Sequence, residues 1–190
     1  MAFPSPAQNE RRRFAVGFAV GVLSALILGL FGITAGARLG LFPIETAGGP
    51  SRVERALSRS AIAGALARRA PRSVSPLPRT DSVLFSGLRI YRNNCAGCHG
   101  DARTGPSDFG RAFYPPAPQF TEHPPRRPEW ESFYLVRNGI RYTGMTAWRS
   151  IMPDDSIWRV VRFVTSLDSL PPAVADRWQH GPRQAAGGER

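Results

Sequence analysis

The 190-residue chain contains no lysine and only two cysteines, and these are separated by two residues. Cysteines this close together do not form the disulfide framework of a small secreted domain. No second Cys/His pair stands at metal-ligand spacing, which argues against a structural zinc site. No segment alternates apolar and polar residues as strands do, whereas a thioredoxin-like redox pair needs a βαβ setting. These absences argue against a disulfide framework, a structural zinc site and a thioredoxin-like redox pair as the role of the two thiols.

All 25 basic residues are arginines, and the formal net charge is +11. The excess is uneven, because residues 1–80 carry 11 Arg against 3 acidic residues, whereas residues 81–170 carry 11 against 9. Residues 171–190 carry 3 Arg against 2 acidic residues. A nucleic-acid-binding domain would concentrate its positive charge on the folded part of the chain. We therefore expect no nucleic acid partner.

The two cysteines belong to the sequence Cys95-Ala96-Gly97-Cys98-His99, which is a C-x-x-C-H motif. This motif is typical of sites where haem is attached covalently. Two thiols at this spacing can each add to a vinyl group of one porphyrin, and the adjacent histidine then ligates the iron. The prediction is one haem c held by Cys95, Cys98 and His99, with half a zinc site or a thiol redox pair as the alternatives.

Phe14–Ala37 is a run of 24 residues without a charged side chain. At about 1.5 Å per residue it is long enough to cross a hydrocarbon core of about 30 Å. Arg11, Arg12 and Arg13 precede it directly, which predicts a cytoplasmic N-terminus and an exported remainder. The alternative is a cleaved signal peptide ending at Ala35-Gly36-Ala37, but the run exceeds the usual apolar length of such peptides.

The composition divides the chain into four regions. These are an N-terminal tail with its anchor at 1–42, an Arg-rich connector at 43–80, a haem domain at 81–170 and a flexible tail at 171–190. A helix is expected between Ser51 and Ala70, lying on an anionic membrane surface, covering the domain or serving as a solvated spacer. The tail is expected to be disordered because it is small, polar and Gly-rich at its end.

Three helices and no strand are predicted for the haem domain. They cover 83–93 with a cap at Thr80, Asp81 or Ser82, then 130–138 with Gly139 as its stop, and 153–167. The long segment 103–128 between the first two is rich in Pro and Gly and is expected to be loop. The fold class is therefore all-α, with a bound haem supplying the apolar centre.

Four side chains are candidates for a second axial ligand of the haem iron: Met145, Met152, His123 and His180. Met145 lies in an irregular stretch between two predicted helices, where its sulfur can turn toward iron. Met152 directly precedes the last helix and is expected to pack in the core. The two histidines lie in a proline-rich loop and in the tail, so they are weaker candidates. The predicted ligand pair is His99 and Met145.

Residues from about Thr80 to Leu167 resemble a class I cytochrome c domain. The resemblance is closest to membrane-anchored monohaem cytochromes. It rests on these residues: Gly87, Ile90-Tyr91, Cys95 to Gly100, Gly139-Ile140, Gly144-Met145 and Ile157 to Phe163, with a YPPAP loop at Tyr114–Pro118 and a TGM-A-W ligand loop ending at Trp148. One departure is Thr146, where such families usually have a proline that stiffens the ligand loop.

The resemblance implies a cytochrome c fold in which the first and last helices cross closely at Gly87. It implies that a proline carbonyl of the 114–118 loop, Pro115 or Pro116, accepts the Nδ1–H of His99. Arg141, Tyr142 and Trp148 flank the ligand loop and are candidates to bond the haem propionates, with a surface or packing role as the alternative.

His/Met ligation leaves no open iron position, so the expected function is outer-sphere transfer of single electrons in a respiratory chain rather than catalysis. The protein would be a shuttle, or a subunit of a dehydrogenase or oxidase complex, with redox proteins as partners and no small-molecule substrate. The expected location is the bacterial inner membrane, spanned once, with the haem domain in the periplasm. The alternatives are a haem subunit with a labile distal ligand that binds a gas or catalyses a reaction, and an anchor subunit whose haem is incidental.

Overall fold

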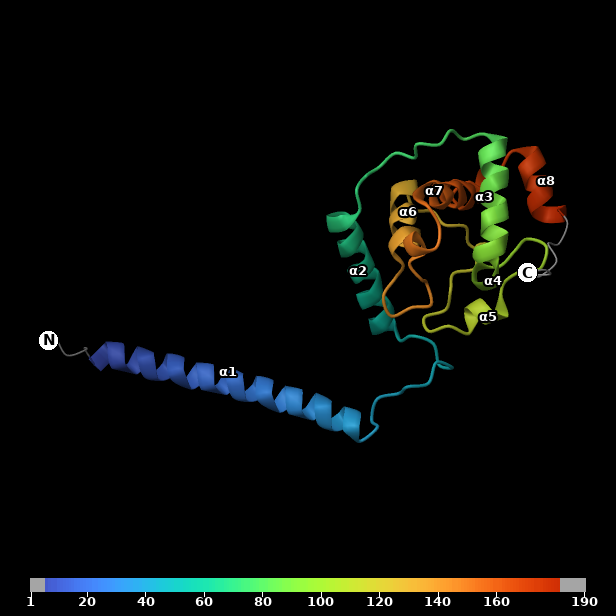
Figure 1. Cartoon of the computed structure of the whole chain (residues 1–190). Coiled ribbons are helices and arrows are strands. Elements are labelled where there is room, and N and C mark those ends of the chain that lie inside the picture. Colours follow the sequence, from blue (N-terminus) through green and yellow to red (C-terminus); the bar gives the residue numbers. More distant parts are fainter. Residues whose placement is uncertain (1–5, 182–190) are drawn as a thin grey trace. The chain divides into compact units, whose positions relative to one another are not determined.

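The structure is a computed structural model that describes residues 6–181, with side chains from residue 10 onward. It contains two compact units, Met1–Glu45 and Thr46–Arg190. The regular structure of the described residues is helical, and its only strand-like pairing is an isolated bridge between Asp101 and Gly105. The predicted all-α class is confirmed (Figure 1).

The main element of the first unit is one long helix, α1, which covers Pro6–Arg38. Within it, Glu10–Arg38 has a mean hydropathy of 2.5, and none of the most apolar stretch is buried. A helix of 29 residues is longer than the about 20 residues needed to cross a bilayer. The predicted span Phe14–Ala37 therefore lies inside a helix that is long and apolar enough to cross a membrane.

The connector forms helix α2, Arg52–Arg69, as expected for the segment between Ser51 and Ala70. Ser51 and Glu54 form a capping box, in which each side chain bonds the other residue's backbone N–H. The first half of α2 is exposed, whereas Leu66 is buried, and the Tyr114 hydroxyl donates to Glu54 over 2.8 Å. The helix therefore contacts the 114–118 loop of its own unit through Glu54.

The haem domain contains helices that match the three predicted ones closely. Helix α3 covers Asp81–Asn94 and is capped by the Thr80 hydroxyl. Helix α6 covers Glu129–Asn138 and ends at Gly139. Helix α7 covers Asp154–Val164, so it ends about three residues earlier than predicted. The remaining short elements are α4 (Ala96–His99), α5 (Asp108–Arg111), η1 (Trp148–Ser150) and η2 (Leu167–Ser169).

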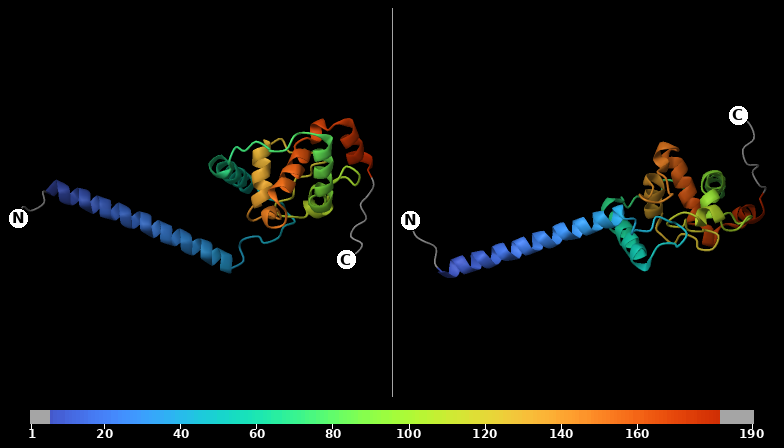
Figure 2. Two further views of the ribbon diagram at one scale, coloured as in Figure 1. Left: turned by 45° about the horizontal axis from the view of Figure 1, so that its top comes forward. Right: turned by 90° about the horizontal axis from the view of Figure 1, so that it is seen from below.

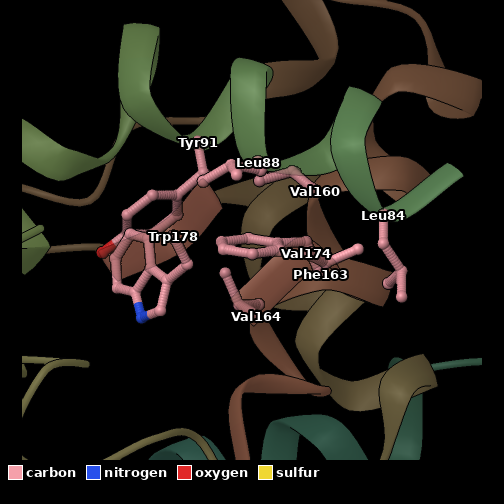
Figure 3. Close-up of a cluster of buried hydrophobic side chains, with 8 residues drawn as sticks. All are labelled: Leu84, Leu88, Tyr91, Val160, Phe163, Val164, Val174 and Trp178. Carbon is pink, nitrogen blue, oxygen red and sulfur yellow. The ribbon is translucent and has the colours of Figure 1, made fainter. Parts of the chain in front are cut away.

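The core forms where α3 crosses α7. The crossing is close because Gly87 lies against the backbone of Arg159, where a Cβ atom would come within 2.2 Å of the Arg159 carbonyl oxygen. Beside this point the rings of Tyr91 and Phe163, both fully buried, lie 5.6 Å apart (Figure 3). The contact inferred from the resemblance, with Tyr91 packed one turn after Gly87, is therefore present.

A second apolar cluster joins α6 to the other face of α7. The rings of Phe133 and Trp158 stack with centroids 3.9 Å apart. Met152 and Trp148 pack against the same cluster. Met152 thus fills the core, as its position before the last helix predicts.

The prediction of a flexible tail from residue 171 is wrong for its first half. Residues Pro172–His180 form helix α8, with Val174 and Trp178 buried against the α3/α7 core. The Trp178 ring makes edge contacts with Tyr91 and Phe163, at centroid distances of 5.6 and 5.5 Å. Figure 2 shows α8 next to α3 in both of its views. The rest of the predicted tail, 182–190, lies outside the described residues.

Helix α8 is compatible with its leading proline and is stabilised by burial. Pro172 is the first residue of the helix, where the missing N–H costs nothing. Val174 and Trp178 are four residues apart and share one helix face. Burying this apolar pair offsets the entropy that the chain loses when it forms a helix. A tail of only small, polar residues has no such burial and stays disordered.

Candidate haem site

Helix α3 delivers the Cys95–His99 segment to the site. Cys95 ends α3 and begins α4, and its carbonyl accepts hydrogen bonds from the backbone N–H groups of Cys98 and His99. This single turn places both thiols three residues apart on a helix, close to one another. Gly100 then closes the turn with φ of +83°, a conformation that suits glycine. Its carbonyl accepts from the buried Tyr91 hydroxyl at 2.7 Å, which ties the turn back to α3.

The thiols do not have the character of a redox pair. Neither cysteine forms a disulfide, and burial together with the nearby Cys98 raises the pKa of Cys95 to about 12. A reactive redox cysteine instead has a lowered pKa and an electropositive setting. Among the described residues, no group of three or more His, Cys, Asp or Glu side chains gathers as a metal site.

The His99 ring is fixed in orientation by the segment that follows α5. The Pro118 carbonyl oxygen lies 2.8 Å from Nδ1, and the Phe120 ring stacks on the imidazole with centroids 4.4 Å apart and planes 7° apart. Burial lowers the pKa of His99, although the Pro118 hydrogen bond opposes this effect. Because Nδ1 donates to the carbonyl, Nε2 is the ring nitrogen that carries the free lone pair for a metal.

This geometry corrects the predicted acceptor, which was Pro115 or Pro116. The acceptor comes from the expected loop but is Pro118. The backbone N–H of Phe120 donates to the His99 carbonyl over 2.9 Å, which aligns the two segments so that residue 118 lies beside the ring.

Gln119 and Gly110 hold the attachment turn from the other side, and sequence reasoning missed both. The buried Gln119 amide donates to the Cys98 carbonyl at 3.0 Å and accepts from the Ser107 N–H at 2.7 Å. A Cβ at Gly110 would lie 1.8 Å from the Cys98 carbonyl oxygen, so only glycine allows α5 to approach this closely. The sequence signal was weak, since one amide and one glycine in a Pro- and Gly-rich loop are unremarkable.

A buried ionic cluster anchors the loop that follows the attachment turn. The Asp101 carboxylate accepts from Arg92 Nε at 2.9 Å and from Arg103 Nε at 3.0 Å. The same arginines reach helix α8 and its end, because Arg92 donates to the Trp178 carbonyl and Arg103 to that of Gly181. Burial raises the pKa of Asp101, but the Arg103 hydrogen bonds and the Arg92 charge outweigh it and hold the pKa below its ordinary value.

Asp101→Asn is expected to destabilise the domain by about 3 kcal/mol at neutral pH, because it leaves two buried arginines without their counter-charge. Since the folded pKa is depressed, the carboxylate's contribution is fully present above the ordinary Asp pKa of about 3.9 and is lost as the pH falls through the lower folded value. The free-energy difference from the wild type, measured by denaturant titration, should therefore shrink in acid. Asp154→Asn, which alters an exposed ion pair with Arg137, is the matched control and should cost less than about 1 kcal/mol. A constant difference across pH would contradict the assignment.

The segment between α6 and η1 forms a tight loop around Met145. Gly139 turns the chain with φ of +69°, and the Ile140 N–H donates to the Met145 carbonyl at 3.0 Å. The Thr143 hydroxyl accepts from the Met145 N–H at 3.0 Å and donates to the Ile140 carbonyl at 2.7 Å. These bonds fix the backbone at Met145, and its side chain is half-buried.

The remaining predicted candidates lie in other settings. His123 is exposed on the proline-rich loop, and His180 is exposed on α8, where it faces Asp176. Arg141 and Tyr142 are exposed in the Met145 loop, and Tyr142 has φ of +62°. Trp148 packs in the α6/α7 cluster. Of the four distal candidates, Met152 packs in the core and both histidines are exposed, whereas Met145 is half-buried in a loop.

The residues of this site fit a covalently attached haem. Two unpaired thiols share one turn, and the adjacent imidazole is oriented by a carbonyl at Nδ1 that leaves Nε2 free. A soft thioether, Met145, lies in a hydrogen-bonded loop elsewhere in the same domain. Thioether and imidazole are the donor set of electron-transfer haems.

Comparison with known proteins agrees with this chemistry. Residues 84–164 match the family model described as cytochrome C oxidase, cbb3-type, subunit III. No curated protein and no solved structure shows a significant match to the chain. The matched range begins in α3 and ends at the last residue of α7, so it contains the attachment turn and the Met145 loop. The chain therefore carries a class I c-type cytochrome domain, an electron-transfer module with covalently bound haem c.

Proposed function

We propose that the protein is a membrane-anchored monohaem cytochrome c that carries single electrons in a respiratory chain. Cys95 and Cys98 would attach the haem, and His99 and Met145 would be its axial ligands. The observation that carries the proposal is the His99 ring, held between the Pro118 carbonyl and the Phe120 face so that Nε2 is the free nitrogen. A carbonyl partner of this kind fixes the tautomer of a ligating histidine and raises its basicity.

A chain of close contacts supports Met145 as the partner of His99. Gly110 touches the Cys98 carbonyl, and Phe109 beside it makes an edge contact with Phe113 at 5.0 Å. The Phe113 ring in turn lies against Gly144, where a Cβ would come within 2.7 Å of it. The residue before Met145 is therefore linked by packing to the attachment turn, as opposite sides of one haem pocket require.

When bound, the haem would supply a reversible one-electron centre, with His99 and Met145 as the residues that would hold its iron. The residues of the chain determine how that centre behaves. Pro118 orients His99, and the hydrogen bonds of Thr143 and Ile140 hold the Met145 backbone. Arg141, exposed in the same loop, is proposed to contact a propionate. Preorganised ligands lower the rearrangement that accompanies each electron transfer.

Helix α1 supports the proposed location. Its apolar stretch is exposed and long enough to span a bilayer, and three arginines precede it. The positive-inside rule then puts the N-terminus in the cytoplasm and the haem domain in the periplasm of a bacterial inner membrane. Tethering raises the effective concentration of the haem near other membrane proteins. A dehydrogenase or oxidase complex is the proposed partner.

The spectrum and the carbon monoxide reactivity of the full-length protein, purified in detergent, test this proposal. The oxidised protein is expected to show the Met–iron charge-transfer band, to titrate reversibly with one electron, and to leave the ferrous form unable to bind carbon monoxide. These results follow because two protein ligands fill both axial positions. Stoichiometric binding of carbon monoxide would overturn the carrier function and favour a gas-binding or catalytic subunit with a labile ligand.

A further inference from the structure

A groove of about 540 Å³ lies on the side of the domain where α3, α7 and α8 meet. Four arginines line it, namely Arg89, Arg92, Arg159 and Arg177, together with the hydroxyl-bearing Ser82 and Ser86. No acidic residue lines the groove. Guanidinium groups stay protonated in proteins, so all the charge that lines this groove is positive.

The charge in the groove is only partly balanced by the surrounding protein. Arg92 pairs with the buried Asp101, and Arg159 pairs with Asp155 one turn earlier on α7. Arg89 and Arg177 form no ion pair with any acidic side chain in residues 10–181. Like charges that gather without counter-charges repel one another, and an anionic partner would relieve this cost.

We propose that this groove docks an acidic segment of a partner protein. Ser82 and Arg92 are ten residues apart on α3, which corresponds to about 15 Å of helix. A single small anion cannot reach both ends of such a groove, whereas a short run of Asp or Glu side chains can. Arginine suits this role because its planar fork binds carboxylates in a bidentate way. The half-buried Phe85 adds an apolar surface for the stems of those side chains.

The position of the groove determines what docking would achieve. None of its lining residues belongs to the Cys95–His99 turn or to the Met145 loop. A partner segment that contacts only these residues touches neither proposed iron ligand, so we assign the groove to assembly rather than to electron exchange. Docking itself is independent of the proposed electron-transfer function, because it uses no haem ligand. The two ideas can therefore fail separately.

A labelled octaglutamate peptide is the probe, and its binding to the full-length protein in detergent is measured by fluorescence anisotropy at fixed salt concentration. The double variant Arg89→Gln/Arg177→Gln is expected to bind the peptide at least about tenfold more weakly, since it removes the two groove charges that have no counter-charge in the protein. The matched control is Arg68→Gln/Arg69→Gln, which removes the same charge from exposed positions on α2. It is expected to stay within about twofold of the wild type, because screening weakens distant charges.

Three outcomes would overturn the proposal. Equal weakening by both double variants would show only general attraction to a basic protein. Binding of phosphatidylglycerol nanodiscs that depends on Arg89 and Arg177, without such dependence for octaglutamate, would assign the groove to a lipid surface. Inorganic phosphate that displaces the peptide at equal concentration would indicate a small-anion site. Ser82 is an exposed residue of α3 that lines the groove, and Ser82→Glu adds a carboxylate there. This variant is expected to bind the peptide more weakly while its haem spectrum stays unchanged, and unchanged peptide binding would contradict the proposal.

Discussion

Replacing Met145 with alanine is expected to lower the reduction potential of the haem by about 0.1–0.2 V, a fraction of the roughly 0.8 V range that axial ligands span. A thioether stabilises the reduced iron relative to harder ligands, so its loss favours the oxidised form. The Met–iron band of the oxidised protein should disappear, and the ferrous form should gain the ability to bind carbon monoxide. Potentiometric titration followed by absorbance measures all three properties in one preparation.

The chain offers a matched control in Met152, its other internal methionine. Met152 packs against the Ile157/Trp158 cluster between α6 and α7, away from the loop bonds that hold Met145. Met152→Ala is expected to cost about 2–4 kcal/mol of stability through the cavity it leaves, while the potential and the Met–iron band stay as in the wild type. If Met152→Ala removes the band and Met145→Ala does not, the ligand assignment is wrong.

The helices of the haem domain could be predicted because their signals are local. Thr80 caps α3, Gly139 ends α6, and two aspartates begin α7, and each signal acts within one turn of its own residue. The tail helix α8 was missed because its stability comes from elsewhere in the chain. Trp178 is buried by its contacts with Tyr91 and Phe163, which lie far from it in the sequence. No local pattern in the short segment that follows Pro172 predicts these contacts.

The residues of the candidate site likewise differ in whether a local sequence pattern predicts them. The C-x-x-C-H motif is five contiguous residues whose chemistry is visible in the sequence, so Cys95, Cys98 and His99 could be proposed there as the attachment residues. The residues that support them are remote in the sequence. Pro118 lies 19 positions from His99 and Gln119 lies 21 from Cys98, and their roles depend on how the loop after α5 folds back. The resemblance indicated that a proline carbonyl of that loop accepts from His99. Which proline it is depends on how the loop aligns with the His99 segment, and only the folded structure defines this alignment.

A large loss of stability is also expected from one added methyl group at the crossing of α3 and α7. Gly87→Ala adds one methyl group at a point where a Cβ would lie 2.2 Å from the Arg159 carbonyl oxygen and 2.8 Å from Phe163 Cβ. Backbone atoms cannot move aside as a flexible side chain can, so the two helices must separate. We expect the domain to lose about 3 kcal/mol, at the upper end of the cost of overpacking a core. Because α3 carries Cys95 at its end, the haem absorbance should also report the displacement.

Gly64→Ala on α2 is the control that isolates packing from helix propensity. Both glycines are helical, but an added Cβ at Gly64 meets no atom within 4 Å. Alanine has the higher intrinsic helix preference, so this substitution is expected to stabilise the protein by about 0.5–1 kcal/mol. Denaturant titrations of the two variants should therefore shift the midpoint in opposite directions. A higher midpoint for Gly87→Ala as well would mean that backbone entropy dominates at Gly87, and that α3 and α7 do not meet as closely there as the structure indicates.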